Sequence, residues 1–207
     1  MKHISLICIS VFITVLSFGQ TLNLQSGLSV SRIYTDGENI QVQRYNALFY
    51  GNTVFLGLDY LNEKYINLSG NIGFIRKGGN IESSDSINYP GQVSFDYLSI
   101  NSMFEFKYPI SSNILPFMSL GLRYDFLLNI NRENNHFWKY NVVKSNSYGL
   151  LVGCGVKYDF SKLQIGLRSD YYYNFNDLAK FHFPANNNDD ALINTFTFNL
   201  IIGYKIK

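Results

Sequence analysis

Charged side chains of opposite sign recur two residues apart in this sequence, as in Glu105 with Lys107, and Arg123 with Asp125. Residues two apart in a β-strand point to the same side, so each pair can meet on one face. Five acids and five bases occupy equivalent positions of the predicted strands: Asp59, Glu105, Lys107, Arg123, Asp125, Lys157, Asp159, Arg168, Asp170 and Lys205. Charges shielded from water need partners, so these ten residues predict a balanced ion-pair network.

The elements that must position these charges are β-strands. Apolar and polar residues alternate with a period of two, for example Leu120 and Leu122 against Ser119 and Gly121. That period is typical of strands with two different faces. Eight segments share it: 22–32, 49–60, 65–75, 93–108, 115–128, 147–158, 163–175 and 194–206. No helical periodicity follows residue 20, so the sequence predicts an all-β protein.

The composition indicates which face points outward. Charged residues make up 15% of the chain, against roughly 25% in typical soluble domains, and aromatics make up 16%. The polar faces carry mostly Gly, Ser, Thr and Asn, and rings gather near strand ends, as at Tyr158 and Phe160. A soluble barrel would alternate too, but these features favour an apolar face in lipid and a polar lumen. A net charge of +2 is too small for a nucleic-acid partner.

Connections between the predicted strands alternate in length. Four are long (33–48, 77–92, 129–146 and 176–193) and the three between them are short (61–64, 109–114 and 159–162). Outer-membrane barrels have long extracellular loops and short periplasmic turns. The sequence therefore predicts one eight-stranded antiparallel transmembrane β-barrel in the outer membrane.

The first twenty residues have the pattern of a secretory signal. Lys2 and His3 precede an apolar run from Ile4 to Leu16, and small residues lie near Gln20. This run is short for the ~20 apolar residues of a spanning helix. We expect residues 1–20 to be removed as a signal peptide and residues 21–207 to form the barrel, with Cys154 as its one thiol.

Several segments resemble a known family. FDYLSINSMFEFKYP at 95–109, PFMSLGLRYDFLL at 116–128 and NTFTFNLIIGYKIK at 194–207 are similar to the PorT-like outer-membrane β-barrel family. The resemblance implies a porin-like fold, surface exposure and, for some members, a part in protein secretion and gliding. Asn101 stands where relatives usually place a proline, and the chain ends in Ile206-Lys207 where such barrels usually end in an aromatic. The family supplies no catalytic residues.

Catalysis is not expected. The histidines after the leader are His136 and His182, both in predicted loops. Asp189 and Asp190 share the predicted loop of His182, so a His–Asp pair that activates water is formally possible there. No nucleophile motif surrounds them. No spacing of His, Cys and carboxylates predicts a metal site, and no cofactor site is predicted.

Two non-enzymatic functions remain. The lumen of an eight-stranded barrel is just wide enough for side chains, so the charges are expected to fill it, with a narrow passive channel for small solutes as the alternative. Loop aromatics could contact a partner or fold onto the rim: Phe137, Trp138, Tyr140, Phe181 and Phe183. We therefore expect a structural or interaction role through loops and rim. The expected partners are outer-membrane lipid and a protein of that membrane, and no oligomeric state is predicted.

Overall fold

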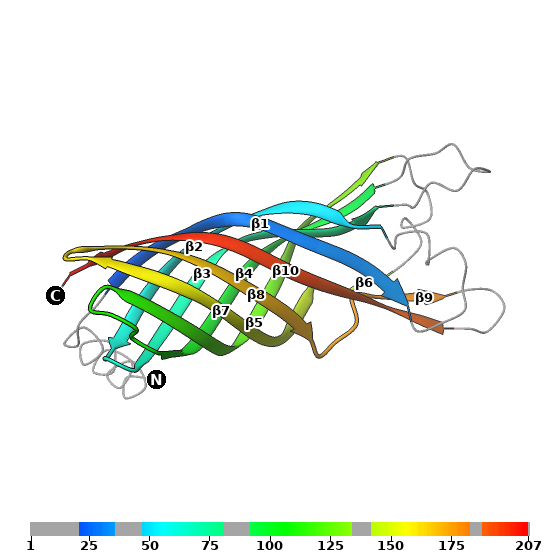
Figure 1. The fold of residues 1–207 in the computed structure, drawn as a ribbon. Helices are drawn as coiled ribbons and strands as arrows, with labels where there is room; N and C mark the ends of the chain where they lie inside the picture. The colour runs from blue at the N-terminus through cyan, green and yellow to red at the C-terminus, as the bar shows by residue number, and fades with distance from the viewer. Residues whose placement is uncertain (1–20, 36–46, 81–91, 134–141, 183–187, 207) are drawn as a thin grey trace, which may run out of the picture.

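The computed structural model describes residues 21–35, 47–80, 92–133, 142–182 and 188–206, which form a closed barrel (Figure 1). Its wall consists of β1 (Thr21–Thr35), β2 (Phe49–Asn62), β3 (Ile66–Asn80), β4 (Gln92–Lys107), β5 (Ile114–Glu133), β7 (Asn146–Phe160), β8 (Leu163–Asn174) and β10 (Asn188–Lys205). Each strand pairs antiparallel with the next, and β1 closes the ring on β10 from Thr21–Lys205 to Thr35–Ala191. The predicted eight-stranded antiparallel barrel is confirmed.

The two ends of the barrel differ. Three short connections, 63–65, 108–113 and 161–162, lie at one end together with Thr21 and Lys205, and we call it the turn end. The tightest of them places Ser161 at a φ of 47°, a left-handed conformation that lets two residues join β7 to β8. The opposite end, where the long connections begin, is called the loop end.

The outward face of the wall is apolar. Leu120 and Leu167 are 53% and 61% exposed, and their neighbours along the wall are of the same kind. Exposed rings form one belt near each end. The turn-end belt contains Tyr65, Phe106, Tyr108, Tyr158, Phe160 and Tyr204, and the loop-end belt contains Tyr50, Tyr124, Phe126, Tyr148, Tyr173 and Phe175. Such belts lie at the two interfaces of a bilayer, so the predicted orientation of the two faces is confirmed.

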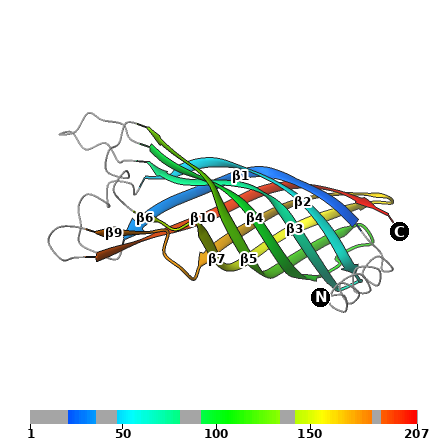
Figure 2. The same ribbon diagram turned by 180° about the vertical axis from the view of Figure 1, so that it is seen from behind.

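The strands reach further toward the loop end than predicted. β3 runs on to Asn80 and β5 to Glu133. Two short strands, β6 (Val142–Val143) and β9 (Ala179–His182), extend the sheet beside β10 (Figure 2). The predicted long connections at 33–48, 77–92, 129–146 and 176–193 were therefore wrong at their edges, since β1 also runs on to Thr35. Within the described ranges, no helix is long and apolar enough to cross a membrane.

In the extensions of β1 and β10 the inward side chains are apolar, which weakens the alternation, whereas β3 continues inward with Lys77. One cluster, the apolar plug, gathers inside the barrel and its extension: Ile33, Phe55, Ile75, Val93, Phe95, Tyr97, Met103, Leu151, Tyr172, Leu178, Ala191 and Ile193. Where both faces of a strand are apolar, alternation fades. A bulge adds to this effect, since Leu128 has no partner between the pairs Asp96–Asn129 and Tyr97–Leu127, and the inward positions of β5 change phase there.

A charge on the outward face should destabilise the barrel according to its depth. Leu120 pairs with Phe104 and Val152 in the middle of the wall. We expect Leu120→Arg to lower the free energy of unfolding by about 2–4 kcal/mol, because the charge would lie in hydrocarbon. The matched control is Phe106→Arg, in the turn-end belt, which should lower the free energy of unfolding by about 0–1 kcal/mol. Guanidinium unfolding in lipid vesicles measures both values, and equal costs would contradict the assigned depth.

Candidate functional site: the charged lumen

Glu105 on β4 is the centre of a buried ion cluster in the turn-side half of the lumen. Its carboxylate accepts hydrogen bonds from Lys157 at 2.6 Å, from Arg168 at 2.9 Å and from the Asn67 amide at 2.8 Å. Arg168 also holds Asp170 at 2.7 Å. We call these residues, with Asp59, the turn-side cluster. All five charged members are nearly inaccessible to solvent, so their stability depends on one another.

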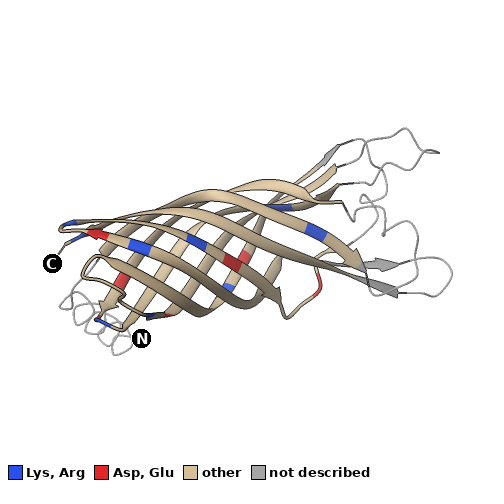
Figure 3. Cartoon of the chain, viewed as in Figure 1, with Lys and Arg blue, Asp and Glu red and all other residues tan. Residues whose placement is uncertain are grey.

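The turn-side cluster crosses the lumen. Lys157 on β7 lies 3.8 Å from Asp59 on β2, and these strands are four positions apart in the ring of eight, on opposite sides of the wall. Asn23 donates to Asp59 at 3.2 Å from β1. Side chains from six strands (β1, β2, β3, β4, β7 and β8) therefore join around Glu105 and Asp59 in the turn-side half of the lumen. Figure 3 marks the charged positions along the strands, with Lys and Arg in blue and Asp and Glu in red.

Small and apolar neighbours make room for the turn-side cluster. A Cβ added at Gly153 would overlap the Asp170 carboxylate and the Ser119 hydroxyl, so only glycine fits beside this carboxylate. Arg168 donates to the Ser119 hydroxyl at 2.8 Å. The Phe117 ring lies 5.0 Å from the Lys157 ammonium and offers it a cation–π contact.

A second group, the loop-side cluster, consists of Lys77, Arg123 and Asp125. Asp125 accepts from the Lys77 ammonium at 2.6 Å and also from the Arg123 guanidinium. The ring of Tyr172 lies 4.8 Å from the Lys77 ammonium and 5.0 Å from the Arg123 guanidinium carbon, and that of Tyr97 lies 5.2 Å from the ammonium. Asp125 balances only one of the two cations, and the faces of these two rings stabilise the remaining positive charge.

The two clusters are complementary in charge. The turn-side cluster has three carboxylates and two cations, and the loop-side cluster has one carboxylate and two cations. Their formal charges of −1 and +1 sum to zero. A chain of neutral amides also lies in the lumen, because Gln25 donates to Asn71 at 2.9 Å and Asn71 to Asn101 at 2.8 Å. Among the described residues, no group of three His, Cys, Asp or Glu side chains could hold a metal ion.

Seven of the ten charges predicted for the network lie in these two clusters: Asp59, Glu105, Arg123, Asp125, Lys157, Arg168 and Asp170. The other three lie at the turn end. Lys205 pairs with Asp159 at 2.7 Å in a partly exposed position, and Lys107 donates to the Asn62 amide oxygen at 2.6 Å. The charges predicted to form a single network therefore lie in two inner clusters and in a separate group at the turn-end rim. The strands place these three groups at different positions along the barrel axis.

Sequence reasoning missed Lys77. It lies two residues beyond the predicted strand end at residue 75, and it is only 1% exposed. Lys77 is an even number of residues away from Asn71 and Gly73, so these residues share one face of β3. Continuing the alternation along β3 would therefore have placed Lys77 inside the barrel. The expected loop contacts Phe137, Trp138, Tyr140 and Phe183 lie outside the described residues, and Phe181 lies in β9, where only the backbone is described.

Comparison with known proteins decides the family. A family model described as outer membrane protein beta-barrel domain matches residues 17–180. The chain belongs to that family. The turn end of this outer-membrane barrel accordingly faces the periplasm and its loop end the cell exterior. Among curated proteins, none matches the sequence.

Solved structures with the same fold are distant in sequence from this outer-membrane barrel. It is similar to the outer membrane protein OprG from Pseudomonas aeruginosa, with 15% identity over 91% of this chain and 96% of that chain and a TM-score of 0.58. It is also similar to Neisserial surface protein A, with 13% identity over 89% of this chain and 97% of that chain and a TM-score of 0.50. At these identities the likeness shows the shared barrel fold.

Removing one member of the turn-side cluster should lower the free energy of unfolding far more than breaking the Lys205–Asp159 pair at the turn end. We expect Glu105→Gln to lower the free energy of unfolding by about 3–5 kcal/mol, because Lys157 and Arg168 would lose their shared buried counter-ion. The matched control is Asp159→Asn, which breaks the partly exposed pair with Lys205 and should cost about 1 kcal/mol or less. Chemical unfolding in vesicles, followed by loss of the heat-modifiable band, compares them. If Glu105→Gln lowered the free energy of unfolding no more than Asp159→Asn does, the charges of the turn-side cluster would not depend on one another.

Proposed function

We propose that this protein is a non-enzymatic outer-membrane barrel with a structural or interaction role, carried by its loops and rims rather than by an open pore. The observation that supports this proposal is the lumen itself, which is crossed by ion pairs such as Lys157–Asp59 and Arg168–Glu105. A solute would have to separate buried, mutually dependent charges in order to pass.

The apolar plug adds a second obstruction in the loop-side half. Phe95, Tyr97 and Tyr172 are each at most 2% exposed and belong to one packed cluster with residues of the opposite wall. A dry apolar cluster cannot solvate an ion, and a closely packed one leaves little room for water. Both halves of the barrel therefore favour a structural core over a passive channel.

The loop end supports an interaction role. β3, β4 and β5 extend together on one side, and β1, β10, β9 and β6 on the other, as both views show (Figures 1 and 2). The apolar plug packs between these extensions through Ile33, Ile75 and Phe95. Strands that are fixed in this way give the long connections firm anchors. Binding residues are often carried on loops that a rigid scaffold positions.

The setting that we propose is a protein secretion apparatus of the outer membrane. Its only support is the resemblance of the sequence to the PorT-like family. We also propose that residues 1–20 are removed on export, which would leave Thr21, the first residue of β1, near the mature N-terminus.

The proposal predicts that the purified barrel does not conduct. In planar bilayers we expect no steady current steps, because side chains of the two ion clusters and the apolar plug occupy the lumen. A wide porin reconstituted under the same conditions is the positive control. Stable, solute-permeable channels formed by this protein would overturn the proposal in favour of a passive conduit.

The loop aromatics provide the test of the interaction role. We expect tagged protein, recovered from native outer membranes after mild crosslinking, to carry a protein partner. The double variant Trp138→Ala, Tyr140→Ala should reduce its recovery by more than about tenfold if these rings are binding hot spots. Asn187→Ala, in another loop, is the matched control. Undiminished recovery with the double variant would exclude these rings as the contact.

A further inference from the structure

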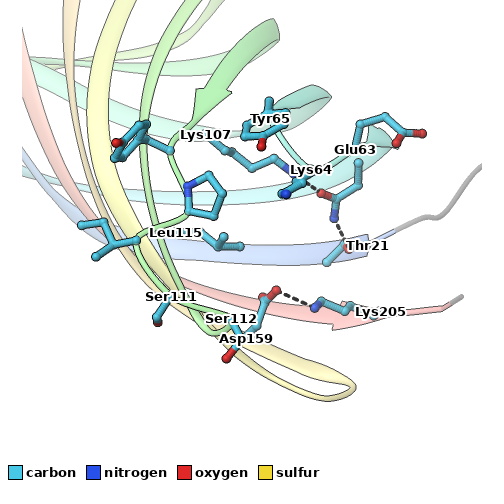
Figure 4. Close-up of a pocket in the computed structure, with 14 residues that line it drawn as sticks. Thr21, Glu63, Lys64, Tyr65, Lys107, Ser111, Ser112, Leu115, Asp159 and Lys205 are labelled. Carbon is cyan, nitrogen blue, oxygen red and sulfur yellow. Dashed lines mark hydrogen bonds and ion pairs between the residues drawn. The ribbon is translucent and has the colours of Figure 1, made fainter.

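A pocket of about 800 Å³ opens at the periplasmic mouth of the barrel (Figure 4). It lies between the start of β1, the turns at 63–65 and 108–113, and the end of β10. Its volume is within the range of ligand pockets, about 300–1,000 Å³. No function assigned above uses it.

Lys107 provides the main charge of this pocket. The side chain is buried at 7% exposure, and its ammonium donates to the Asn62 amide oxygen at 2.6 Å, while the Asn62 amide donates to the Thr21 hydroxyl at 3.2 Å. Over the described parts of the chain, no carboxylate oxygen lies within 4.0 Å of this ammonium. An ammonium has three donors, so two remain for a ligand. Glu105, Asp59 and Asp159 attract the Lys107 ammonium through space but do not contact it, so its remaining donors are open to an anion.

The other charges of the pocket leave Lys107 in excess. The Asp159 carboxylate is engaged by Lys205 at 2.7 Å, and Glu63 directs its carboxylate away from Lys107 (Figure 4). Lys64, on the same turn as Glu63, adds an exposed cation. The lining thus holds three lysines against two acids, and one of those acids is already paired.

Apolar groups stand beside this charge. Ile110 is 67% exposed, and it lines the pocket together with Leu115. A ligand that suits such a lining has an anionic group next to an apolar one.

We propose that the periplasmic mouth binds an acidic peptide segment, with a carboxylate on the Lys107 ammonium and an adjacent apolar side chain against Ile110 and Leu115. A carboxylate accepts a charge-assisted hydrogen bond from an ammonium, and arginine, which is over-represented at phosphate sites, is not among the described residues that line this pocket. The site is at the opposite end of the barrel from the loops, so this proposal stands independently of the loop-mediated role.

The test uses the full-length mature barrel in nanodiscs of phosphatidylcholine. The probe is a fluorescein-labelled hexapeptide of alternating leucine and glutamate, and its dissociation constant is measured by anisotropy. We expect saturable binding that weakens as salt is added, and loss of binding when glutamine replaces glutamate in the peptide. Equal binding of the glutamine peptide would overturn the proposal.

Two variants assign the binding to Lys107. Lys107→Met removes the cation and keeps an apolar stem, and Asn62→Asp gives Lys107 a carboxylate partner within the chain. Each should weaken binding by about tenfold or more, because a charge-assisted hydrogen bond is lost or already occupied. Lys162→Met, in the neighbouring turn but outside the pocket, is the matched control and should change the constant less than about twofold. A heat-modifiable band shows that each variant is folded, and equal effects of Lys107→Met and Lys162→Met would overturn the assignment.

Competition separates the peptide from other anions. Inorganic phosphate, and nanodiscs that contain phosphatidylglycerol, should leave peptide binding within about twofold at constant ionic strength. Strong displacement by phosphate would replace the peptide with a phosphate ligand, and displacement by phosphatidylglycerol alone would replace it with a lipid headgroup. Either result would overturn the proposal.

Discussion

The structure depends on the closure of β1 against β10. In hydrocarbon, a strand edge with unpaired N–H and C=O groups is too costly to expose, so a sheet that spans a bilayer must close. Fifteen residue pairs join the first strand to the last, from Thr21–Lys205 to Thr35–Ala191. Eight strands close around a lumen only as wide as its side chains. Whatever points inward must therefore be packed, paired or both.

The lumen meets this requirement in two ways along its length. The turn-side half is polar and is held by Glu105 and its cations, and the loop-side half is apolar and is packed around Phe95, Tyr97 and Tyr172. The loop-side cluster lies where these regimes meet, since the rings of Tyr97 and Tyr172 belong to the apolar plug and also contact the Lys77 ammonium. An interior that is packed or ion-paired along its length is better suited to hold the two ends of the barrel rigidly than to let solutes pass between them.

Those ends differ in chemistry. Toward the cell exterior, extended strands enclose the apolar plug. Toward the periplasm, short turns surround a small pocket in which Lys107 has a neutral partner and exposed rings stand nearby. A barrel closed in the middle can still bind different partners on the two sides of the membrane, with no passage of material between them.

The sequence by itself determined the architecture and the direction of the side chains. A period of two, maintained over eight segments, fixes which residues share a face, and the composition indicates which face meets lipid, so Leu120 and Glu105 could be placed on opposite faces from sequence alone. The two-residue spacing accounts for Arg123–Asp125 and Arg168–Asp170. Only the tertiary structure decided which charges meet across the lumen, because partners such as Lys157 and Asp59 are brought together by barrel closure. It also decided the apolar plug, since alternation disappears where both faces of a strand are apolar, and the pairing of Lys77 with Asp125 on another strand. Strand register sets the position of each charge along the barrel axis, and it therefore separates Lys107 from the inner clusters. A single sequence does not specify this register.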